Sequence, residues 1–210
     1  DVDRFELDGR PVEDKKLAAC LADLRAHYDV PPLVVRSRNN FPTAAGLASS
    51  ASGFAALVTA IDGHCRLGMD AATRSTFARR ASGSAARSIF GGFVALDGPA
   101  WAARPLLERA DWPLRVVVAV TSAGPKAVAS SAGMRLSMAS PFYPAWVTST
   151  HEDFRLAVDH VRNRDFDALA ELAEHSCLKM HGLMLATRPG LVYWNPVTLE
   201  CLHRIRALRA

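Results

Sequence analysis

The sequence predicts a mixed α/β protein, because short apolar runs typical of strands alternate with longer segments whose apolar residues recur at helical spacing. In the first half, residues 33–37 lead through a glycine-containing loop into the apolar segment 54–61. In the second half, residues 114–120 lead through a turn into a segment rich in alanine and serine. Two long amphipathic segments, residues 146–162 and 166–185, follow and predict helices. This order of elements indicates strands and helices mixed along the chain.

Residues 96–113 are rich in proline and tryptophan, and we expect them to form a loop that divides the chain. The predicted domains are therefore residues 1–110 and 111–210. A chain of 210 residues can bury a sizeable core, and its 50% hydrophobic and 22% charged residues are ordinary for a globular protein.

The net charge is +4, and no basic run resembles a nucleic-acid-binding tail. We therefore expect a small anionic partner, with no nucleic acid and no membrane, since no apolar run reaches membrane-spanning length. The four cysteines, Cys20, Cys65, Cys177 and Cys201, form no CxxC pair. Their spacing argues against a zinc site or a disulfide scaffold and favours a reducing, cytoplasmic setting.

The first half contains five predicted elements. Residues 4–10 alternate and end on a turn, which predicts a strand, and residues 13–27 have the apolar spacing of a helix. Residues 33–37 form the next strand. The helix after the central loop is expected to close over residues 63–68, and residues 71–81 form a further short helix.

The second half begins with residues 114–120, an uninterrupted apolar run that predicts a buried strand. A helix is expected to start near Ser130. After the two amphipathic helices, Pro196 opens the last helix, since proline is favoured in a first turn.

The central loop places small side chains, Ala44 to Ser49, before a helix. Ligands can approach such a backbone closely, and the helix N-terminus favours an anion such as phosphate. The hydroxyls of Ser49, Ser50 and Ser52 can reach phosphate oxygens or a metal ion. From chemistry alone a second interpretation stays open, in which the serines merely cap the helix and the alanines pack tightly.

A second anion-binding pattern is Ser82-Gly83-Ser84, followed by Arg87 one helical turn beyond Ser84. The guanidinium fork can bind phosphate or carboxylate oxygens through two parallel bonds. An N-capped helix with a solvated arginine is the structural alternative. A third pattern, Lys126 in a turn before Ser130 and Ser131, again suggests anion contact, although turn lysines are often only solvated.

His175, Cys177 and His181 could suggest a metal site. However, six helical steps rotate His181 by about 600° relative to His175, which puts the two rings on different faces. We therefore expect no joint metal site there.

The stretch Pro-Thr-Ala-Ala-Gly-Leu-Ala-Ser-Ser-Ala-Ser, residues 42–52, resembles the ATP-phosphate loop of the GHMP kinase superfamily. The preceding Asn39-Asn40-Phe41 resembles the mevalonate diphosphate decarboxylase family in particular. Residues 81–94 are similar to its Gly-Ser-Gly-Ser-Ala-x-Arg-Ser element, departing from it at Ala81. Residues 126–134 are similar to its Lys-x-x-x-Ser-x-x-Gly-Met element, with Ser131 where relatives carry arginine or threonine. The resemblance covers essentially the whole chain.

The resemblance implies a GHMP kinase-like α/β (α+β) fold. Its parts would be a ribosomal protein S5 domain 2-like N-terminal domain and a ferredoxin-like C-terminal domain, both incomplete. It implies ATP and Mg²⁺ as cofactors and assigns no metal ligand. The implied ATP-phosphate-binding residues are Ala45, Gly46, Leu47, Ala48, Ser49, Ser50, Ser52 and Ser130. The implied substrate-binding residues are Ser82, Ser84, Arg87, Gly133 and Met134.

The implied activity is ATP-dependent decarboxylation of mevalonate 5-diphosphate to isopentenyl diphosphate, in the mevalonate pathway of isoprenoid biosynthesis. A cytoplasmic enzyme, compatible with a homodimer, is expected. Alternatives are a related kinase or decarboxylase acting on mevalonate or its monophosphate, or a truncated, non-catalytic binding protein.

We expect this chain to be the central portion of such an enzyme. The family's N-terminal Lys/Tyr segment and its Phe-Asp-Ala-Gly-Pro-Asn segment, which carries the catalytic aspartate, are not found in it. Asp70, Asp97, Asp111 and Asp165 stand in no such context. Residues 1–210 alone are therefore expected not to decarboxylate the substrate.

Overall fold

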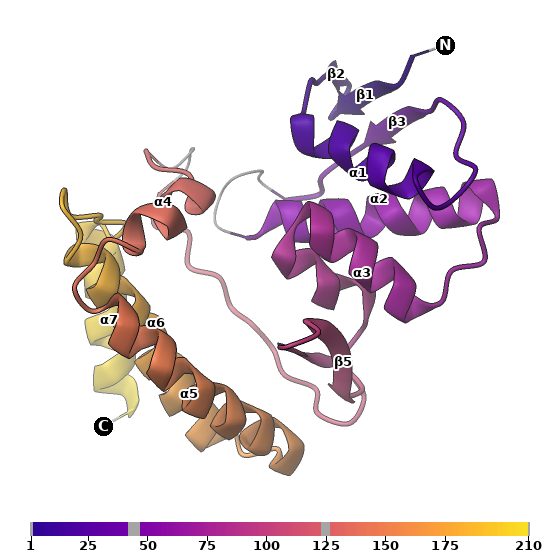
Figure 1. Ribbon diagram of the computed structural model, residues 1–210. Helices are drawn as coiled ribbons and strands as arrows, with labels where there is room; N and C mark the ends of the chain where they lie inside the picture. Colours follow the sequence, from indigo (N-terminus) through magenta and orange to yellow (C-terminus); the bar gives the residue numbers. More distant parts are fainter. Residues whose placement is uncertain (1, 42–46, 123–126, 210) are drawn as a thin grey trace. The chain divides into compact units, whose positions relative to one another are not determined.

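The computed structural model describes residues 2–41, 47–122 and 127–209 (Figure 1). The chain divides into two compact units, residues 1–112 and residues 113–210, called here the N-terminal and C-terminal units. The N-terminal unit mixes strands and helices. Every regular element among the described residues of the C-terminal unit is a helix. No helix in the described ranges has the length and apolar character needed to cross a bilayer.

The N-terminal unit contains a three-stranded sheet in the order β2-β1-β3. Strand β1 (Arg4–Leu7) pairs antiparallel with β2 (Arg10–Pro11) and parallel with β3 (Val34–Ser37). The turn between β1 and β2 passes through Asp8 and Gly9, both of which have positive φ. The predicted strands at 4–10 and 33–37 are therefore confirmed, the first of them as a hairpin.

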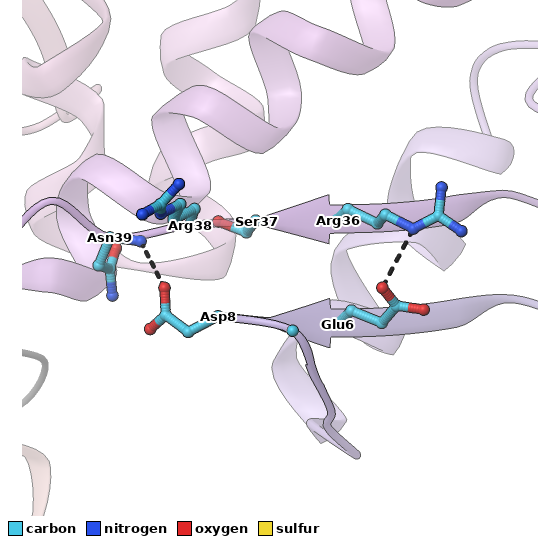
Figure 2. Close-up of a pocket in the computed structure, with 7 residues that line it drawn as sticks. Glu6, Asp8, Arg36, Ser37, Arg38 and Asn39 are labelled. Carbon is cyan, nitrogen blue, oxygen red and sulfur yellow. Dashed lines mark hydrogen bonds and ion pairs between the residues drawn. The ribbon is translucent and has the colours of Figure 1, made fainter.

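The two faces of this sheet differ because successive side chains alternate across it. Phe5 and Val35 lie opposite each other and pack against the hydrophobic core. On the other face Glu6 lies opposite Arg36, and the Arg36 Nε atom lies 3.1 Å from the Glu6 carboxylate. Figure 2 shows this exposed pair on the two neighbouring strands.

The helices of the N-terminal unit are α1 (Lys15–Arg25), α2 (Ser49–Cys65), α3 (Ala71–Ala81) and the 3₁₀ helix η1 (Gly83–Ile89). Asp14 caps α1 by accepting from the Lys16 N–H at 2.7 Å. Asp70 caps α3 by accepting from the Thr73 N–H at 2.7 Å. These local caps begin the helices close to where the sequence predicts, and α3 has the predicted bounds.

The core of this unit lies where α1, α2, α3 and η1 meet. Leu21, Leu24 and Val58 are fully buried at its centre. The α3 residue Ser75 donates its hydroxyl to the carbonyl oxygen of Ala86 at 2.9 Å, in the interior. This bond fixes η1 against α3, so the short 3₁₀ helix has a defined position beside the core.

Arg25 ties the end of α1 to the start of two strands. Its guanidinium donates two hydrogen bonds to Asp3, at 2.6 and 2.8 Å, and one to the carbonyl oxygen of Val30 at 2.9 Å. Asp3 also accepts from the Leu33 N–H at 2.8 Å. The hydrogen bonds from Arg25 are the main cause that lowers the pKa of Asp3. The entry to β3, and thus the path to the central loop, is fixed by this network.

The expectation that residues 96–113 form a loop is wrong. Residues 93–97 (β4) and 102–107 (β5) form an antiparallel hairpin. Pro105 is tolerated because a two-stranded ribbon has two open edges, where a missing N–H costs little. Trp112 stacks on Phe93 with ring centroids 5.1 Å apart, so the aromatic residues pack on the hairpin.

The helices of the C-terminal unit are α4 (Ser130–Ser137), α5 (Tyr143–Asn163), α6 (Phe166–Leu185) and α7 (Pro196–Arg209). Helix α6 has the predicted bounds, with Asp165 as its N-cap, and Pro196 opens α7 as expected. Helices α5 and α6 pack together. Between them, Lys179 forms a partly buried ion pair with Asp153 and donates to the Ser149 hydroxyl at 2.8 Å.

The expectation that residues 114–120 form a buried strand is also wrong. This segment has no regular secondary structure, and the side chains of Val116 and Val117 are 86% and 94% exposed. A strand is stable only when neighbouring strands satisfy its backbone N–H and C=O groups. The described part of the C-terminal unit supplies no such neighbour, so the apolar run stays unpaired.

Candidate functional site

Helix α2 begins without a side-chain cap. Its N-cap is Ala48, a left-handed residue with φ 54° and ψ 43°, and no acidic residue lies in the first turn. A left-handed backbone at alanine costs roughly 1–2 kcal/mol, which marks the position as constrained. The serines therefore do not cap this helix through the N-cap position, contrary to the simpler of the two interpretations of the motif. A helix start without a side-chain cap presents backbone N–H groups and a positive dipole end that can bind an anion.

The predicted phosphate-binding residues around this helix start are only partly described. Ala45 and Gly46 lie outside the described residues. Ser49 is half-buried, whereas Leu47, Ala48, Ser50 and Ser52 are exposed. The Ser52 hydroxyl donates to the Ser49 carbonyl oxygen at 3.2 Å.

A cavity of about 480 Å³ opens beside Ser49 and Ser50. Its walls come from β1, β3, α1 and α2, with apolar surface from Phe54 and Leu57 and polar groups from Asp14 and others. Concave, mainly apolar pockets of this size with a few polar groups suit small organic ligands. The sequence did not predict this cavity, because its walls come from segments far apart in the chain.

A second hollow of about 650 Å³ lies at the end of β1 and β3 (Figure 2). The Asn39 N–H donates to the Asp8 carboxylate at 2.9 Å, just where the chain leaves β3 for the central loop. Glu6 and Arg36 pair with each other along the same edge. These contacts brace the start of the loop, and Arg38 also lines the hollow (Figure 2).

Helix η1 brings the second predicted group of residues together. The hydroxyl oxygens of Ser82 and Ser84 are 3.5 Å apart. Ala85 and Ala86 are fully buried, so the opposite face of η1 carries the polar side chains. Residues three apart eclipse in a 3₁₀ helix, which places Ser84 and Arg87 on one face.

Arg87 is exposed, and no acidic side chain in the described part of the chain forms an ion pair with it. An unpaired guanidinium beside two hydroxyls can bind a carboxylate or phosphate through parallel hydrogen bonds. Helix η1 packs against α2. The N-terminal unit therefore holds two candidate anion-binding elements on neighbouring helices.

The third predicted group lies on α4 in the C-terminal unit. Ser130 is its exposed first residue, and the N-cap Ala129 has no side-chain hydrogen bond. Met134 is 51% exposed, whereas Gly133 is buried. A Cβ atom at Gly133 would lie 2.3 Å from the Tyr193 hydroxyl oxygen. The close approach of Tyr193 gives a structural reason for glycine at this position.

Four aspartates that the sequence left without a catalytic context have structural contacts. Asp70 and Asp165 cap α3 and α6. Asp97 lies 3.4 Å from Arg104 across the hairpin, and Asp111 accepts from the Glu108 N–H at 2.9 Å.

The described residues contain no group of three or more histidine, cysteine, aspartate or glutamate side chains arranged to hold a metal ion. All four cysteines are free thiols. Burial is the main cause that raises the pKa of Cys20 to about 11, which keeps this thiol protonated at neutral pH.

Comparison with known proteins covers both units. A family model for the diphosphomevalonate decarboxylase-like N-terminal domain matches residues 1–100, and one for the mevalonate 5-diphosphate decarboxylase C-terminal domain matches residues 116–209. The chain is 35% identical to diphosphomevalonate decarboxylases of Ganoderma lucidum and Homo sapiens, over 93% and 99% of its length. It spans 55% and 58% of those relatives, so it covers little more than half of their length.

Solved structures give the same result. The chain is similar to the protein MDDEF in complex with MVAPP, AMPPCP and magnesium, with a TM-score of 0.84 and 33% identity, covering 100% of this chain and 67% of that one. The mevalonate diphosphate decarboxylase from Trypanosoma brucei has a TM-score of 0.83 and 28% identity, covering 99% and 59%. The predicted GHMP kinase-like fold class is thereby confirmed. On the family models and these likenesses together, the chain belongs to the diphosphomevalonate decarboxylase family.

Proposed function

We propose that the protein carrying this chain converts mevalonate 5-diphosphate to isopentenyl diphosphate at the expense of ATP. The observation that carries the proposal is the pairing of two anion-binding elements in one unit. Helix α2 starts without a side-chain cap, and the packed helix η1 presents Arg87 with two hydroxyls. Membership of the decarboxylase family supports this use of the two elements, and the two compact units would be its two domains.

ATP would bind with its phosphates at the start of α2. Residues 47–52 would provide backbone N–H groups and hydroxyls, and the adjoining cavity of about 480 Å³ would accept the rest of the nucleotide. Ser130 of the C-terminal unit would contact the terminal phosphate. A magnesium ion fits this donor set, because Mg²⁺ prefers hydroxyl and phosphate oxygens. The Ser49 and Ser50 hydroxyls are its candidate protein ligands, and its chemistry is to neutralise the phosphate charge.

The organic substrate would bind at η1. Arg87 binds the carboxylate through its guanidinium fork, while Ser82 and Ser84 donate to the substrate from the same face. Gly133 and Met134 would border the substrate from α4. Gly133 is buried and has no side chain, so it could contribute only through its backbone, whereas the exposed Met134 could also contribute its side chain.

In the reaction, the tertiary 3-hydroxyl of mevalonate diphosphate takes the terminal phosphoryl group of ATP, giving ADP. The C–O bond to that phosphate then breaks, and electrons of the bond to the carboxylate form the new double bond. Carbon dioxide, phosphate and isopentenyl diphosphate are the products. The chain's own residues hold both reactants in place, which is the largest part of catalysis in phosphoryl transfer. Four unpaired thiols support a reducing, cytoplasmic location for this enzyme.

Two variants in the natural protein test the proposal. Ser49→Ala and Ser50→Ala should weaken ATP use while leaving the unfolding transition almost unchanged, because Ser50 is exposed and Ser49 is only half-buried. Thr59→Ala, on an exposed turn of the same helix, is the control. Unchanged ATP affinity and turnover in both serine variants would contradict the assignment.

Product analysis by mass separates the proposed reaction from related ones. Isopentenyl diphosphate with equimolar ADP and carbon dioxide supports the proposal. A phosphorylated product without loss of carbon dioxide indicates a kinase, and turnover of mevalonate or its monophosphate alone indicates a relative with another substrate. ATP binding with no product would indicate a non-catalytic binding protein.

A further inference from the structure

The segment Tyr193–Asn195, between α6 and α7, contacts the chain on both sides of residues 123–126. The Tyr193 hydroxyl donates to the carbonyl oxygen of Val128 at 3.1 Å. The Asn195 side-chain amide donates to the carbonyl oxygen of Thr121 at 3.0 Å. One short segment therefore binds the backbone at two positions before α4, Thr121 and Val128.

The amide of Asn195 has a single orientation that satisfies all its neighbours. Its oxygen accepts from the Thr198 N–H at 2.8 Å and from the Thr198 hydroxyl at 3.0 Å, which caps α7. Its nitrogen then faces Thr121 as a donor. The hydroxyl oxygens of Thr121 and Thr198 lie 3.1 Å apart and close this network. The first turn of α7 thus anchors Thr121.

Tyr193 is held by the residues around its ring. The absent side chain of Gly133 leaves the space that the phenol occupies. The ring of His181, from α6, lies 6.5 Å from the Tyr193 ring and 4.7 Å from the Trp194 ring, measured between centroids. Helix α6 therefore supports the segment through the contact of His181 with the rings of Tyr193 and Trp194.

The contact of Tyr193 with Val128 bears on the first turn of α4. Val128 directly precedes the N-cap Ala129, whose carbonyl oxygen accepts from the Gly133 N–H at 2.9 Å. The same Gly133 packs against the Tyr193 hydroxyl. Tyr193 thus touches the turn at both ends, with Ser130 between them.

We propose that Tyr193 is a positioning residue for the reaction, because it fixes the first turn of α4 and with it Ser130. Asn195 supports Tyr193 by capping α7, the helix that follows it. The inference rests on the proposed function, in which Ser130 contacts the terminal phosphate of ATP. A displacement of about 1 Å in such a group can lower turnover on the order of a hundredfold. The hydrogen bond from Tyr193 to Val128 opposes that displacement.

Tyr193→Phe in the natural protein is the test, since it removes the hydroxyl and keeps the ring. Tyr143→Phe, at the start of α5 in the same unit, is the matched control. Hydrogen–deuterium exchange should become faster in peptides covering residues 127–137 for Tyr193→Phe and stay unchanged across residues 166–185. Unchanged exchange at 127–137 would overturn the proposal, whether or not the protein is active.

A double-mutant cycle distinguishes positioning from a general structural effect. Tyr193→Phe alone should lower kcat at least tenfold at a temperature where the protein is fully folded. In a Ser130→Ala background, the same change should have little further effect, because the group that it positions is gone. Fully additive losses would overturn the proposal. A wild-type protein that does not turn over would refute the proposed function instead, while the exchange experiment still decides whether Tyr193 anchors α4.

Discussion

Replacing Gly92 by alanine should destabilise the N-terminal unit strongly, whereas the same change at Gly91 should not. Gly92 has φ +68°, in the left-handed region. A Cβ atom there would lie 2.2 Å from the carbonyl oxygen of Leu107 and 2.9 Å from the backbone nitrogen of Arg109. A Cβ atom at Gly91 would have no neighbouring atom within 4 Å, and Gly91 has no positive φ. The two adjacent glycines thus form a matched pair.

The magnitude follows from two contributions. The left-handed backbone costs roughly 1–2 kcal/mol for a residue with a Cβ atom. The overlap with the β5 backbone cannot be relieved by a side-chain rotation, and overpacking of this kind costs about 1–3 kcal/mol. Together they lower the free energy of unfolding by roughly 2–5 kcal/mol, out of about 5–15 kcal/mol for a typical domain.

Urea unfolding followed by tryptophan fluorescence measures this difference, because Trp112 stacks on Phe93 of the hairpin. Gly91→Ala should unfold at the wild-type midpoint or slightly above it, since alanine restricts the unfolded chain. Gly92→Ala should shift the midpoint down with an unchanged slope. Because η1 packs on this hairpin, η1 should lose its fixed position in the same variant. Equal midpoints for the two variants would refute the reasoning.

Three further predictions concern single side chains. Arg87→Lys keeps the charge but loses the fork, so kcat/KM for mevalonate diphosphate should fall by the equivalent of about 1–3 kcal/mol, while Arg10→Lys on the exposed strand β2 should leave it unchanged. Asp3→Asn should lower the free energy of unfolding by about 1 kcal/mol at pH 7. Since the folded-state pKa of Asp3 lies below its usual 3.8, this contribution is present above about pH 4 and is lost as the pH falls through the folded-state value; equal stability of the two proteins in urea at pH 7 would contradict this. In thiol alkylation at pH 8, the exposed Cys177 should react first, and the buried Cys20 should react only after unfolding, as peptide mass mapping would show.

Elements with local signals were predicted closely. Helices α3 and α6 have the predicted bounds because Asp70 and Asp165 cap them within the sequence itself. The same holds for Pro196 at the start of α7, whose fixed φ suits a first turn. A cap or a first-turn proline acts over three or four residues, so a single sequence shows it.

Elements that depend on a partner were predicted poorly. Strand β5 was missed because its pairing with β4 outweighs the proline at position 105. Residues 114–120 were wrongly predicted to form a buried strand from their apolar run alone. Such a run becomes buried only when neighbouring segments pair with it and cover it. Whether a segment forms a strand depends on the partner segment that pairs with it, and the segment's own sequence does not identify that partner.

The candidate site divides in the same way. Ser49, Ser82 and Arg87 could be predicted because each lies in a contiguous motif. Tyr193 and Asn195 were not, since their contacts reach residues 65 and 74 positions away along the chain. A contiguous motif indicates the residues proposed to contact a ligand, whereas the residues that hold them in place can be identified only in the folded chain.

Helix starts bear on the proposed phosphate contacts of α2 and α4. Helices α1, α3 and α6 each begin at an aspartate whose carboxylate accepts from the first turn. Helices α2 and α4 begin instead at alanines, Ala48 and Ala129, without a side-chain cap. An aspartate at either position would satisfy the first-turn N–H groups and repel a phosphate. Helix α5 also begins without a side-chain cap, at Phe142, so an uncapped start alone does not identify a phosphate site. At α2 and α4 the missing cap coincides with the family's phosphate motifs, where it would leave the positive helix ends for the proposed nucleotide, at a cost in helix stability of about 1 kcal/mol each.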